Sequence, residues 1–233
     1  MEGFVLAAGL GTRLRPLTDD RPKALVEVGG QPLLALVLER LVEAGVRHVV
    51  VNVHHFADQV EACLRSREWG CRVDISDERA LLLDTGGALK HAASLFSGSE
   101  PVLVHNVDVL STIDLREVVR CHLTAGNMAT LCCSDRPTQR KLLFDSDGRL
   151  LGREGSVSAA GRPLAFSGIS VVSPELFPLL PEADHPYPVI DQYIRLSPRH
   201  AVRCHVHPAG QWLDVGRPET LQKAQLWYPS SSK

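Results

Sequence analysis

The sequence predicts an α/β fold built on a doubly wound, mostly parallel central sheet. Short apolar runs with the length of buried strands lie at residues 4–8, 48–53, 72–76 and 102–105. Predicted helices separate them at residues 32–45, 57–67 and 88–95, with a turn expected at residues 84–87. Strands and helices that alternate in this way form a parallel sheet with helices on both faces. Ligands of such folds bind at the carboxyl ends of the strands.

After residue 125, the predicted elements change from alternating strands and helices to a series of short strands. Short strand-like runs follow at residues 129–134, 141–144, 149–151 and 166–172. We expect them to form a small antiparallel insertion that faces the first half. The prediction is a single domain over residues 1–228, with halves 1–125 and 126–210 and a closing segment 211–228. Residues 229–233, which include three serines, are expected to form a disordered tail.

The composition is that of an ordinary globular protein. The 233 residues are 44% hydrophobic and 22% charged, with a net charge of −2. A nucleic-acid-binding protein would show a basic surface and a membrane protein a long apolar run, so we expect neither partner. The six cysteines include no C-x-x-C pair and are too sparse for a disulfide framework. We therefore expect reduced thiols and a cytoplasmic location.

The N-terminal segment predicts a phosphate-binding loop. The first apolar run ends at Gly9, and Gly9 and Gly11 allow backbone N–H groups to approach a ligand closely. A row of such N–H groups forms a concave site for phosphate oxygens. Arg13, Arg15 and Lys23 add cations, which pair well with a polyphosphate. A glycine-rich surface turn with scattered basic residues is the plainer alternative.

Two common glycine-rich motifs do not match this loop. The dinucleotide-binding fingerprint requires a third glycine where this chain has Leu14, and Arg15-Pro16 prevents an immediate helix. A P-loop requires a Gly-Lys pair, which is absent from the sequence. A dinucleotide-dependent oxidoreductase is therefore disfavoured.

Residues 9–18 and 22–25 carry the sequences G-L-G-T-R-L-R-P-L-T and P-K-A-L. This pattern resembles the signature of the sugar-1-phosphate nucleotidyltransferases. The resemblance implies a Rossmann-like (GT-A-like) fold whose first half binds a nucleotide and whose second half binds mainly a sugar. It also implies the reaction of a nucleoside triphosphate with a sugar 1-phosphate, which gives a nucleotide-sugar and pyrophosphate. By the same resemblance, Arg13 and Lys23 are the catalytic cations. The nucleotide-binding residues that it implies are Ala8, Gly9, Gly11, Thr12, Arg13, Glu78, Thr85, Gly86 and Gly87.

Two aspartates predict a magnesium site. Asp108 follows the predicted strand 102–105 at the ligand-binding edge of the sheet, where a carboxylate is a hard oxygen ligand suited to Mg²⁺. A helix cap is the alternative role for such an aspartate, but Asp114 stands in a better position for that cap. The resemblance assigns metal binding to Asp108 and, within W-L-D-V-G-R-P, to Asp214. Val107 departs from the family, which usually has glycine at this position.

The resemblance also locates the sugar. The strand F-S-G-I at residues 166–169 lines the sugar pocket in the family. A strand glycine that is needed only for packing is an equal alternative for Gly168. The sugar-binding residues that we predict are Asn106, Ser167, Gly168 and Asp191.

The substrates are predicted by likeness alone. The chain looks most like the short uridylyltransferases that use UTP and N-acetylmuramate 1-phosphate. GTP with mannose 1-phosphate or a heptose 1-phosphate is an alternative pair. A catalytically silent homologue that binds nucleotide-sugar as a regulatory subunit is an alternative of another class, favoured only by Val107. No sequence feature indicates the oligomeric state.

Overall fold

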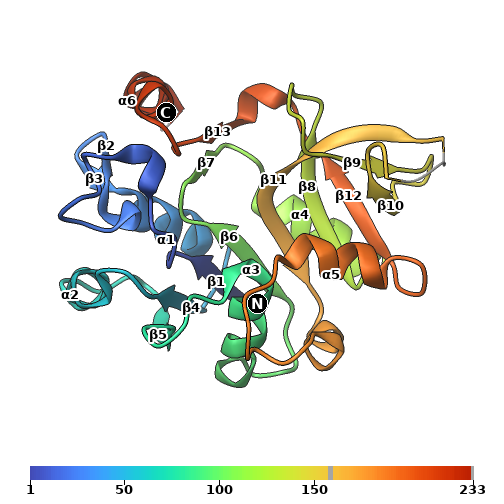
Figure 1. The fold of residues 1–233 in the computed structure, drawn as a ribbon, viewed down its shortest axis with the longest axis horizontal. Coiled ribbons are helices and arrows are strands. Elements are labelled where there is room, and N and C mark those ends of the chain that lie inside the picture. The colour runs from blue at the N-terminus through green and yellow to red at the C-terminus, as the bar shows by residue number, and fades with distance from the viewer. Residues whose placement is uncertain (157–159, 232–233) are drawn as a thin grey trace.

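One sheet runs through the whole molecule. The computed structural model of the protein describes residues 1–156 and 160–231, with side-chain surroundings through residue 227. The strand order is β10-β9-β11-β6-β1-β4-β5, and β8 pairs with both β11 and β12 (Figure 1). The strands of this sheet are β1 (Glu2–Leu6), β4 (His48–Val53), β5 (Arg72–Asp77), β6 (Val102–Asn106), β8 (Ala129–Ser134), β9 (Lys141–Phe144), β10 (Leu150–Arg153), β11 (Arg162–Val172) and β12 (Val202–Val206). Two small ribbons pair β2 (Glu27–Val28) with β3 (Gln31–Pro32), and β7 (Val109–Ser111) with β13 (Trp212–Asp214).

Strands β6, β1, β4 and β5 form the parallel half of the sheet and confirm the predicted α/β class. Each follows one of the apolar runs of the first half of the sequence, within about two residues of the expected bounds. Leu6 pairs in register with Asn52 on β4 and with Asn106 on β6. The last residues of β1 and β6 therefore lie beside Asn52 at one edge of the sheet, where a doubly wound fold binds its ligands.

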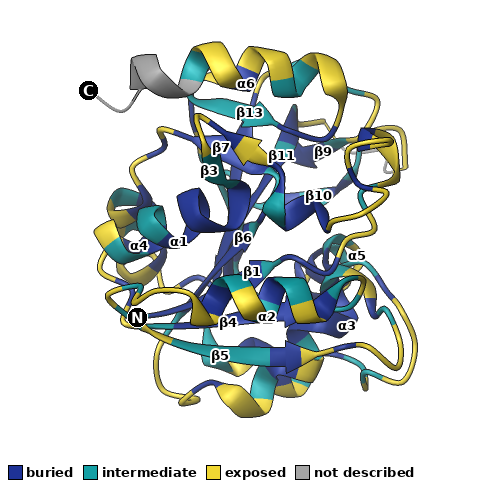
Figure 2. Cartoon of the chain, turned by 90° about the vertical axis from the view of Figure 1, so that its left-hand side faces the viewer, coloured by how far each residue is buried: buried dark blue, intermediate teal, exposed yellow. Residues whose placement is uncertain are grey.

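Helices cover both faces of this sheet because alternate strand residues point into two separate cores. On β4, Val49 and Val51 pack into the core under α1, α2 and α4, whereas Val50 packs into the core under α3 and α5. On β1, Val5 packs into the first of these cores and Phe4 into the second. Figure 2 shows the strands mostly buried between the helices. The helices are α1 (Leu33–Glu43), α2 (Ala57–Arg65), α3 (Asp84–His91), α4 (Leu115–Thr124), α5 (Val189–Leu196) and α6 (Pro218–Ser231).

Most strands of the second half pair antiparallel with their neighbours, as predicted, and they extend the central sheet; β12 is the exception, because it pairs parallel with β8. β11 pairs antiparallel with β6, β8 and β9, so it joins the two halves along one continuous sheet. The sequence predicted only residues 166–172 of this strand, whose first part starts at Arg162. The pairing of β11 with β8 shifts register at a bulge between Phe166 and Ser170, and this bulge contains Gly168 at a φ of 73°. The division into halves at residue 125 stays a prediction.

Two boundaries differ from the predicted ones. The turn expected at residues 84–87 is the first turn of α3, which begins at Asp84. Two consecutive glycines disfavour a helix by local propensity. Here the carbonyl of Tyr187 accepts the N–H groups of Gly86 and Gly87, and this satisfies donors that a helix start leaves unpaired. At the C-terminus, α6 extends to Ser231, beyond the expected start of the tail at residue 229. Residues 232–233 lie outside the described part.

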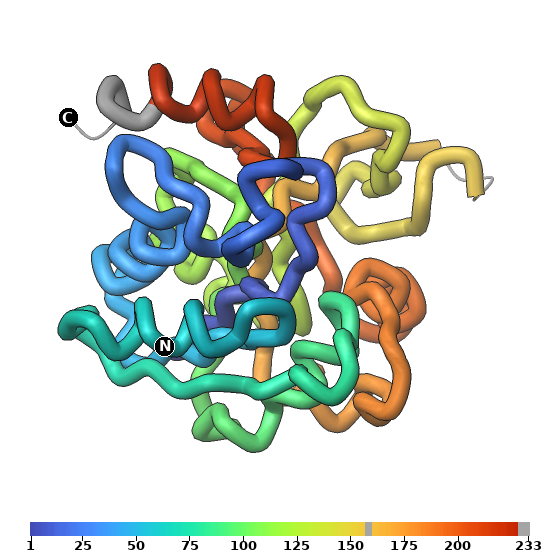
Figure 3. The backbone as a smooth tube through the Cα atoms, turned by 60° about the vertical axis from the view of Figure 1, so that its left-hand side comes forward, coloured from blue at the N-terminus to red at the C-terminus, as the bar shows by residue number. Residues whose placement is uncertain are grey.

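The last helix returns to the N-terminal half. Gln225 on α6 accepts the N–H of Gly29 and donates to the carbonyl of Glu27, at 2.9 Å each. Figure 3 shows α6 beside this β2–β3 ribbon, with the N-terminal loop passing in front. Within residues 1–156 and 160–231, no helix is both long and apolar enough to cross a bilayer.

Asp114 caps α4, as predicted. Its side chain accepts the N–H groups of Arg116 and Glu117, at 3.0 and 3.2 Å from Oδ1. We expect Asp114→Ala to lower the free energy of unfolding by about 1 kcal/mol, because two donors lose their acceptor. Asp114→Asn should leave it almost unchanged, since asparagine caps helices equally well. Urea denaturation of both variants measures the difference, and equal losses in the two would contradict a capping role.

Candidate active site

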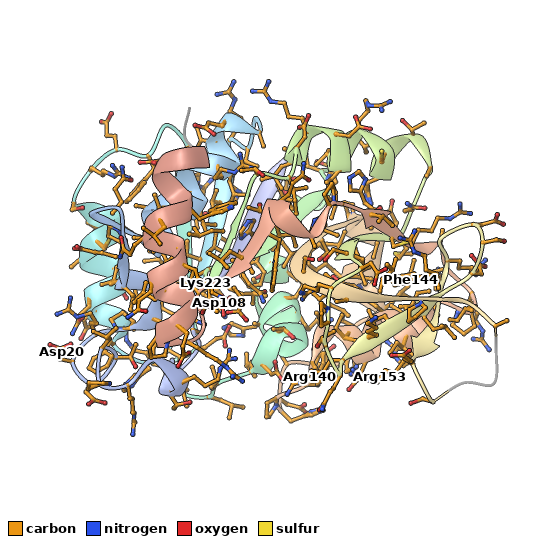
Figure 4. The ribbon with its side chains drawn as sticks, turned by 90° about the horizontal axis from the view of Figure 1, so that it is seen from above. Asp20, Asp108, Arg140, Phe144, Arg153 and Lys223 are labelled. Atoms are coloured by element: carbon orange, nitrogen blue, oxygen red, sulfur yellow. The ribbon has the colours of Figure 1, made fainter. Side chains whose placement is uncertain are left out.

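A cavity of about 610 Å³ lies at the carboxyl edge of β1, β4 and β6. Figure 4 shows Asp108 near the middle of the molecule, with Phe144 and Arg153 out in the second half. Ten of the residues that the sequence assigned to the site line this cavity: Ala8, Gly9, Gly11, Thr12, Arg13, Lys23, Glu78, Thr85, Asn106 and Asp108.

The loop after β1 curls tightly around Gly11. Gly11 has a φ of 65°, a left-handed conformation that glycine adopts without strain. Its carbonyl accepts the hydroxyl of Thr18 at 2.9 Å and the N–H of Leu14 at 2.9 Å. A Cβ at Gly11 would lie 3.0 Å from Cβ of Lys23, so the glycine also lets the two ends of the loop meet. Gly9 has open space at the same position, which leaves its backbone accessible to a ligand.

Lys23 and Asp108 form an ion pair at the floor of the cavity. Lys23 is only 7% exposed, and its Nζ donates to Oδ2 of Asp108. Pro22 precedes Lys23 and starts a short 3₁₀ turn, which turns the lysine inward from the loop. The ion pair places the Lys23 side chain next to the loop that follows β1, and both residues line the cavity.

Asp214 reaches the same place through the β7–β13 ribbon. In that ribbon Asp214 pairs with Val109, which follows Asp108 directly. The N–H of Val215 donates to the carbonyl of Asp108 at 2.8 Å. The two predicted metal ligands are therefore neighbours in space, although more than a hundred residues separate them in the chain.

Asp214 has the environment of a metal ligand. Burial and the nearby Asp108 carboxylate raise the pKa of Asp214, and the charges of Lys23 and Arg13 oppose this effect. Its Oδ1 is buried and accepts no hydrogen bond of ordinary geometry within the described chain, although the backbone N–H of Gly216 helps to lower the pKa of the carboxyl group. A buried carboxylate oxygen without a donor is costly unless a cation binds it. The two carboxylates fit Mg²⁺, which proteins commonly hold with one or two carboxylates plus substrate phosphates. No third His, Cys, Asp or Glu joins them within residues 1–156 and 160–231.

Arg13 lies against the backbone next to Asp214. A Cβ at Gly216 would lie 2.8 Å from Nη2 of Arg13 and 2.5 Å from Oδ1 of Asp214. Glycine at this position therefore lets the guanidinium and the carboxylate approach one strand of backbone. Arg13 is an exposed residue that lines the cavity, and its charge acts on the nearby Asp214.

Asn52 is a cavity residue that the sequence analysis missed. It is 2% exposed, and its Oδ1 accepts the N–H groups of Ala7 at 2.6 Å and Ala8 at 3.2 Å. Its Nδ2 donates to Oε1 of Glu78 at 2.8 Å. Burial raises the pKa of Glu78, against the bonds from Asn52 and the N–H of Leu83, which lower it. The sequence feature that could have identified Asn52 is its place inside the apolar run V-V-V-N-V. A buried amide there needs hydrogen-bond partners.

Gly86 and Gly87 do not line the cavity. Their N–H groups donate to the carbonyl of Tyr187, at 2.8 and 3.3 Å. A Cβ at Gly86 would lie 2.5 Å from the ring of Tyr187. Thr85 does line the cavity, and its hydroxyl accepts the N–H of Val189 at 2.9 Å. These contacts hold α3 against the segment before α5, and this segment brings Pro186 to the cavity. No pattern in the sequence predicted Pro186 as a cavity residue.

We expect Gly86→Ala to destabilise the protein by about 1–3 kcal/mol, because the new methyl group overlaps the Tyr187 ring. Gly210→Ala is the matched control, since a Cβ there meets no heavy atom within 4 Å. Its free energy of unfolding should change by less than about 0.5 kcal/mol. Urea denaturation distinguishes the two, and an unchanged midpoint for Gly86→Ala would contradict the close packing.

The predicted sugar residues separate into two groups. Asn106 lines the cavity, and Gly168 lies against it, because a Cβ at Gly168 would be 2.8 Å from Nδ2 of Asn106. Ser167 is buried, and its hydroxyl lies 2.8 Å from Nε2 of His207. Asp191 is exposed and forms an ion pair with Arg153 at 2.6 Å, outside the cavity lining.

Val107 fits its place beside Asp108. It is 4% exposed and belongs to the hydrophobic core that includes Val109 and Leu110. Its N–H donates to the carbonyl of Leu6 at 3.1 Å, so the backbone here continues the pairing of β1 with β6. Its side chain also forms part of the cavity lining.

Comparison with known proteins identifies the family of the chain. The family described as "Nucleotidyl transferase" matches residues 2–144, more than half of the chain. The chain is 42% identical over 232 residues to N-acetylmuramate alpha-1-phosphate uridylyltransferase of Caulobacter vibrioides, covering 95% of this chain and 94% of that protein. It is 34% identical over 236 residues to the protein of the same name from Neisseria meningitidis serogroup B, covering 97% of each.

A solved structure supports the fold. UDP-glucose pyrophosphorylase from Acinetobacter baumanii superposes with a TM-score of 0.83 at 20% identity, covering 97% of this chain and 92% of that one. At this level of identity the likeness concerns the fold. Together with the family match and the two relatives, it shows that the chain belongs to the nucleotidyl transferase family and is a nucleotidyltransferase.

Proposed function

We propose that the protein joins UTP and N-acetylmuramate 1-phosphate to give the nucleotide-sugar and pyrophosphate. The observation that carries this proposal is the cavity that the loop after β1 lines together with Lys23 and Asp108, with Asp214 close behind Asp108. The names of the relatives at 42% and 34% identity support the substrate pair.

In the proposed reaction, an oxygen of the sugar 1-phosphate attacks the α-phosphorus of UTP. At the same time, the α-phosphorus loses its bond to the oxygen that bridges it to the β-phosphate, and pyrophosphate leaves. The attacking phosphate is largely dianionic at pH 7, since its second pKa is about 6, so the step needs no general base. Catalysis then depends on alignment and on neutralising negative charge.

The cations of the site have separate tasks in this reaction. Lys23, buried beside Asp108, holds the reacting phosphates. Arg13, which is exposed, stabilises charge on the departing pyrophosphate. The backbone from Gly9 to Thr12 cradles the triphosphate, where Gly9 leaves its N–H group accessible.

Asp108 and Asp214 hold Mg²⁺ in this proposal. The orphaned Oδ1 of Asp214 and the adjacent Asp108 carboxylate supply the hard oxygen ligands that this ion prefers. When bound there, the ion neutralises charge on the phosphate oxygens. Whether one ion or two bind follows from a metal titration.

The substrates extend to opposite sides of the cavity. The nucleobase lies near Ala8, Glu78 and Thr85, which line one side. Gly86 and Gly87 act indirectly, because they hold the α3 segment in position. The sugar lies near Asn106, with Gly168 behind it. A role for Ser167 or Asp191 requires the sugar to extend beyond the cavity, toward β11 and α5.

The six cysteines are free thiols, which is typical of a protein from a reducing compartment and supports a cytoplasmic location for the reaction.

The test is pyrophosphate release with Mg²⁺, with UTP, GTP, CTP and dTTP each combined with a panel of sugar 1-phosphates. We expect release with UTP and N-acetylmuramate 1-phosphate, abolished by EDTA. Release only with GTP and mannose or heptose 1-phosphate would replace the substrate pair. Binding of a nucleotide-sugar without turnover of any pair would overturn the enzymatic proposal in favour of a regulatory protein.

A further inference from the structure

The side-chain amide of Asn52 has only one satisfactory orientation. Its Oδ1 accepts two backbone N–H groups, those of Ala7 and Ala8, and its Nδ2 faces Glu78. The reversed amide would place an NH₂ group against two N–H donors and an oxygen against a carboxylate. Three hydrogen bonds would then be lost in a buried site, which is costly. Asn52 therefore presents its donor to Glu78.

Glu78 is in turn held as a hydrogen-bond acceptor. Its Oε1 accepts from Asn52 at 2.8 Å, and its Oε2 accepts the N–H of Leu83 at 3.2 Å. Each carboxylate oxygen has a second lone pair, and Glu78 lines the cavity. The backbone of Glu78 is fixed as well, because its N–H donates to Val53 and its carbonyl contacts the His54 ring. The cavity edge at Glu78 thus offers acceptors to a ligand.

We propose that Asn52 is a positioning residue that fixes the hydrogen-bond polarity of the nucleobase pocket. This inference rests on the proposed function, which places the nucleobase near Ala8 and Glu78. An acceptor at this edge matches a ring nitrogen that carries a hydrogen, as in uracil. It opposes a ring nitrogen that presents a lone pair, as in cytosine. Because Asn52 also holds Ala7 and Ala8, one side chain links base selection to the start of the phosphate loop.

The polarity can be removed and then reversed by substitution. In Asn52→Asp the two bonds to the loop persist, but two buried carboxylates now face each other and share a proton. Because of this shared proton, the cavity edge at Glu78 no longer presents only hydrogen-bond acceptors to the base. In the double variant Asn52→Asp/Glu78→Gln, the new amide donates to the new carboxylate. The bond between the two side chains returns with reversed polarity, and a second N–H turns toward the cavity.

The readout is the ratio of UTP to CTP affinity, measured by calorimetry with Mg²⁺ and without a sugar phosphate. We expect the wild type to favour UTP. Asn52→Asp should lower the ratio about tenfold, and the double variant should lower it by about 100-fold while its melting temperature recovers toward that of the wild type. A purely structural role for Asn52 predicts instead that stability and the ratio recover together.

Asn127→Asp is the matched control. Asn127 is also a buried asparagine, and its Nδ2 donates to the Thr130 hydroxyl at 3.0 Å, away from the cavity. We expect this variant to lose stability and to keep the wild-type ratio.

The outcomes separate the two proposals. A wild type that binds UTP, with an unchanged ratio in the double variant, overturns this inference alone. A wild type that favours CTP over UTP also overturns it. A wild type that binds neither nucleotide overturns the proposed function and this inference with it. If Asn52→Asp does not fold, the double variant decides.

Discussion

We expect Lys23→Ala to lower kcat/KM for pyrophosphate release by about 100- to 1,000-fold, which is the typical cost of losing one preorganised charge at a reacting phosphate or oxyanion. Lys23 is 7% exposed and paired with Asp108, so solvent does not replace its charge when the side chain is removed. The loss should appear mainly in kcat, because the loop backbone still binds the triphosphate. Steady-state kinetics with varied UTP measures the division between kcat and KM.

Lys90→Ala is the control for the Lys23 variant. Lys90 pairs with Glu182 at 3.4 Å, and the Glu182 side chain is 82% exposed. Exposed ion pairs contribute little, so stability and kcat/KM should both stay near the wild-type values. A Lys23→Ala enzyme as active as Lys90→Ala, at the same melting temperature, would remove Lys23 from the mechanism.

We expect Asp214→Asn to lower the rate by about 100-fold or more and to raise the stability of the metal-free protein. The rate falls because a neutral amide binds Mg²⁺ weakly. Stability rises because the pKa of Asp214 is raised, mainly by burial and then by Asp108, so the charged carboxylate opposes folding. In the wild type this penalty grows as the pH rises through the raised pKa and vanishes below the unfolded value of about 3.8.

The measurement is thermal unfolding in EDTA at several pH values, together with Mg²⁺-dependent turnover. The melting temperature of Asp214→Asn should exceed that of the wild type at pH 7, and the difference should disappear in acid. Asp114→Asn carries the same chemical change at a helix cap and should match the wild type in activity and stability. An Asp214→Asn protein that is less stable without metal would contradict the orphaned carboxylate as a metal ligand.

Local patterns predicted the parallel half of the fold well. The strands β1, β4 and β6 follow mostly apolar runs, and burial on both faces makes such runs easy to recognise. The loop around Gly11 was also recognisable, because glycines and cations cluster within a few residues. The cap at Asp114 depends on hydrogen bonds to residues two and three positions along the chain. Such a local feature can be predicted from the sequence alone.

Features that depend on distant contacts could not be predicted in this way. The start of α3 depends on the Tyr187 carbonyl, about a hundred residues away, which overrides the low helix propensity of Gly86 and Gly87. The pairing of β11 with β6 is a register between remote segments. The family resemblance paired Asp214 with Asp108 as a metal ligand on the opposite side of the cleft; that the two residues are neighbours could not be predicted, since the β7–β13 ribbon that joins them has no local signature.

The most direct test of the account uses UTP labelled at the α-phosphate, incubated with Mg²⁺, the enzyme and N-acetylmuramate 1-phosphate. We predict that the label appears in the nucleotide-sugar and that unlabelled pyrophosphate is released in equal amount. Neither product should form with Asp108→Asn. Label recovered only in unreacted UTP, with an enzyme shown to bind both substrates, would contradict nucleotidyl transfer to this sugar phosphate.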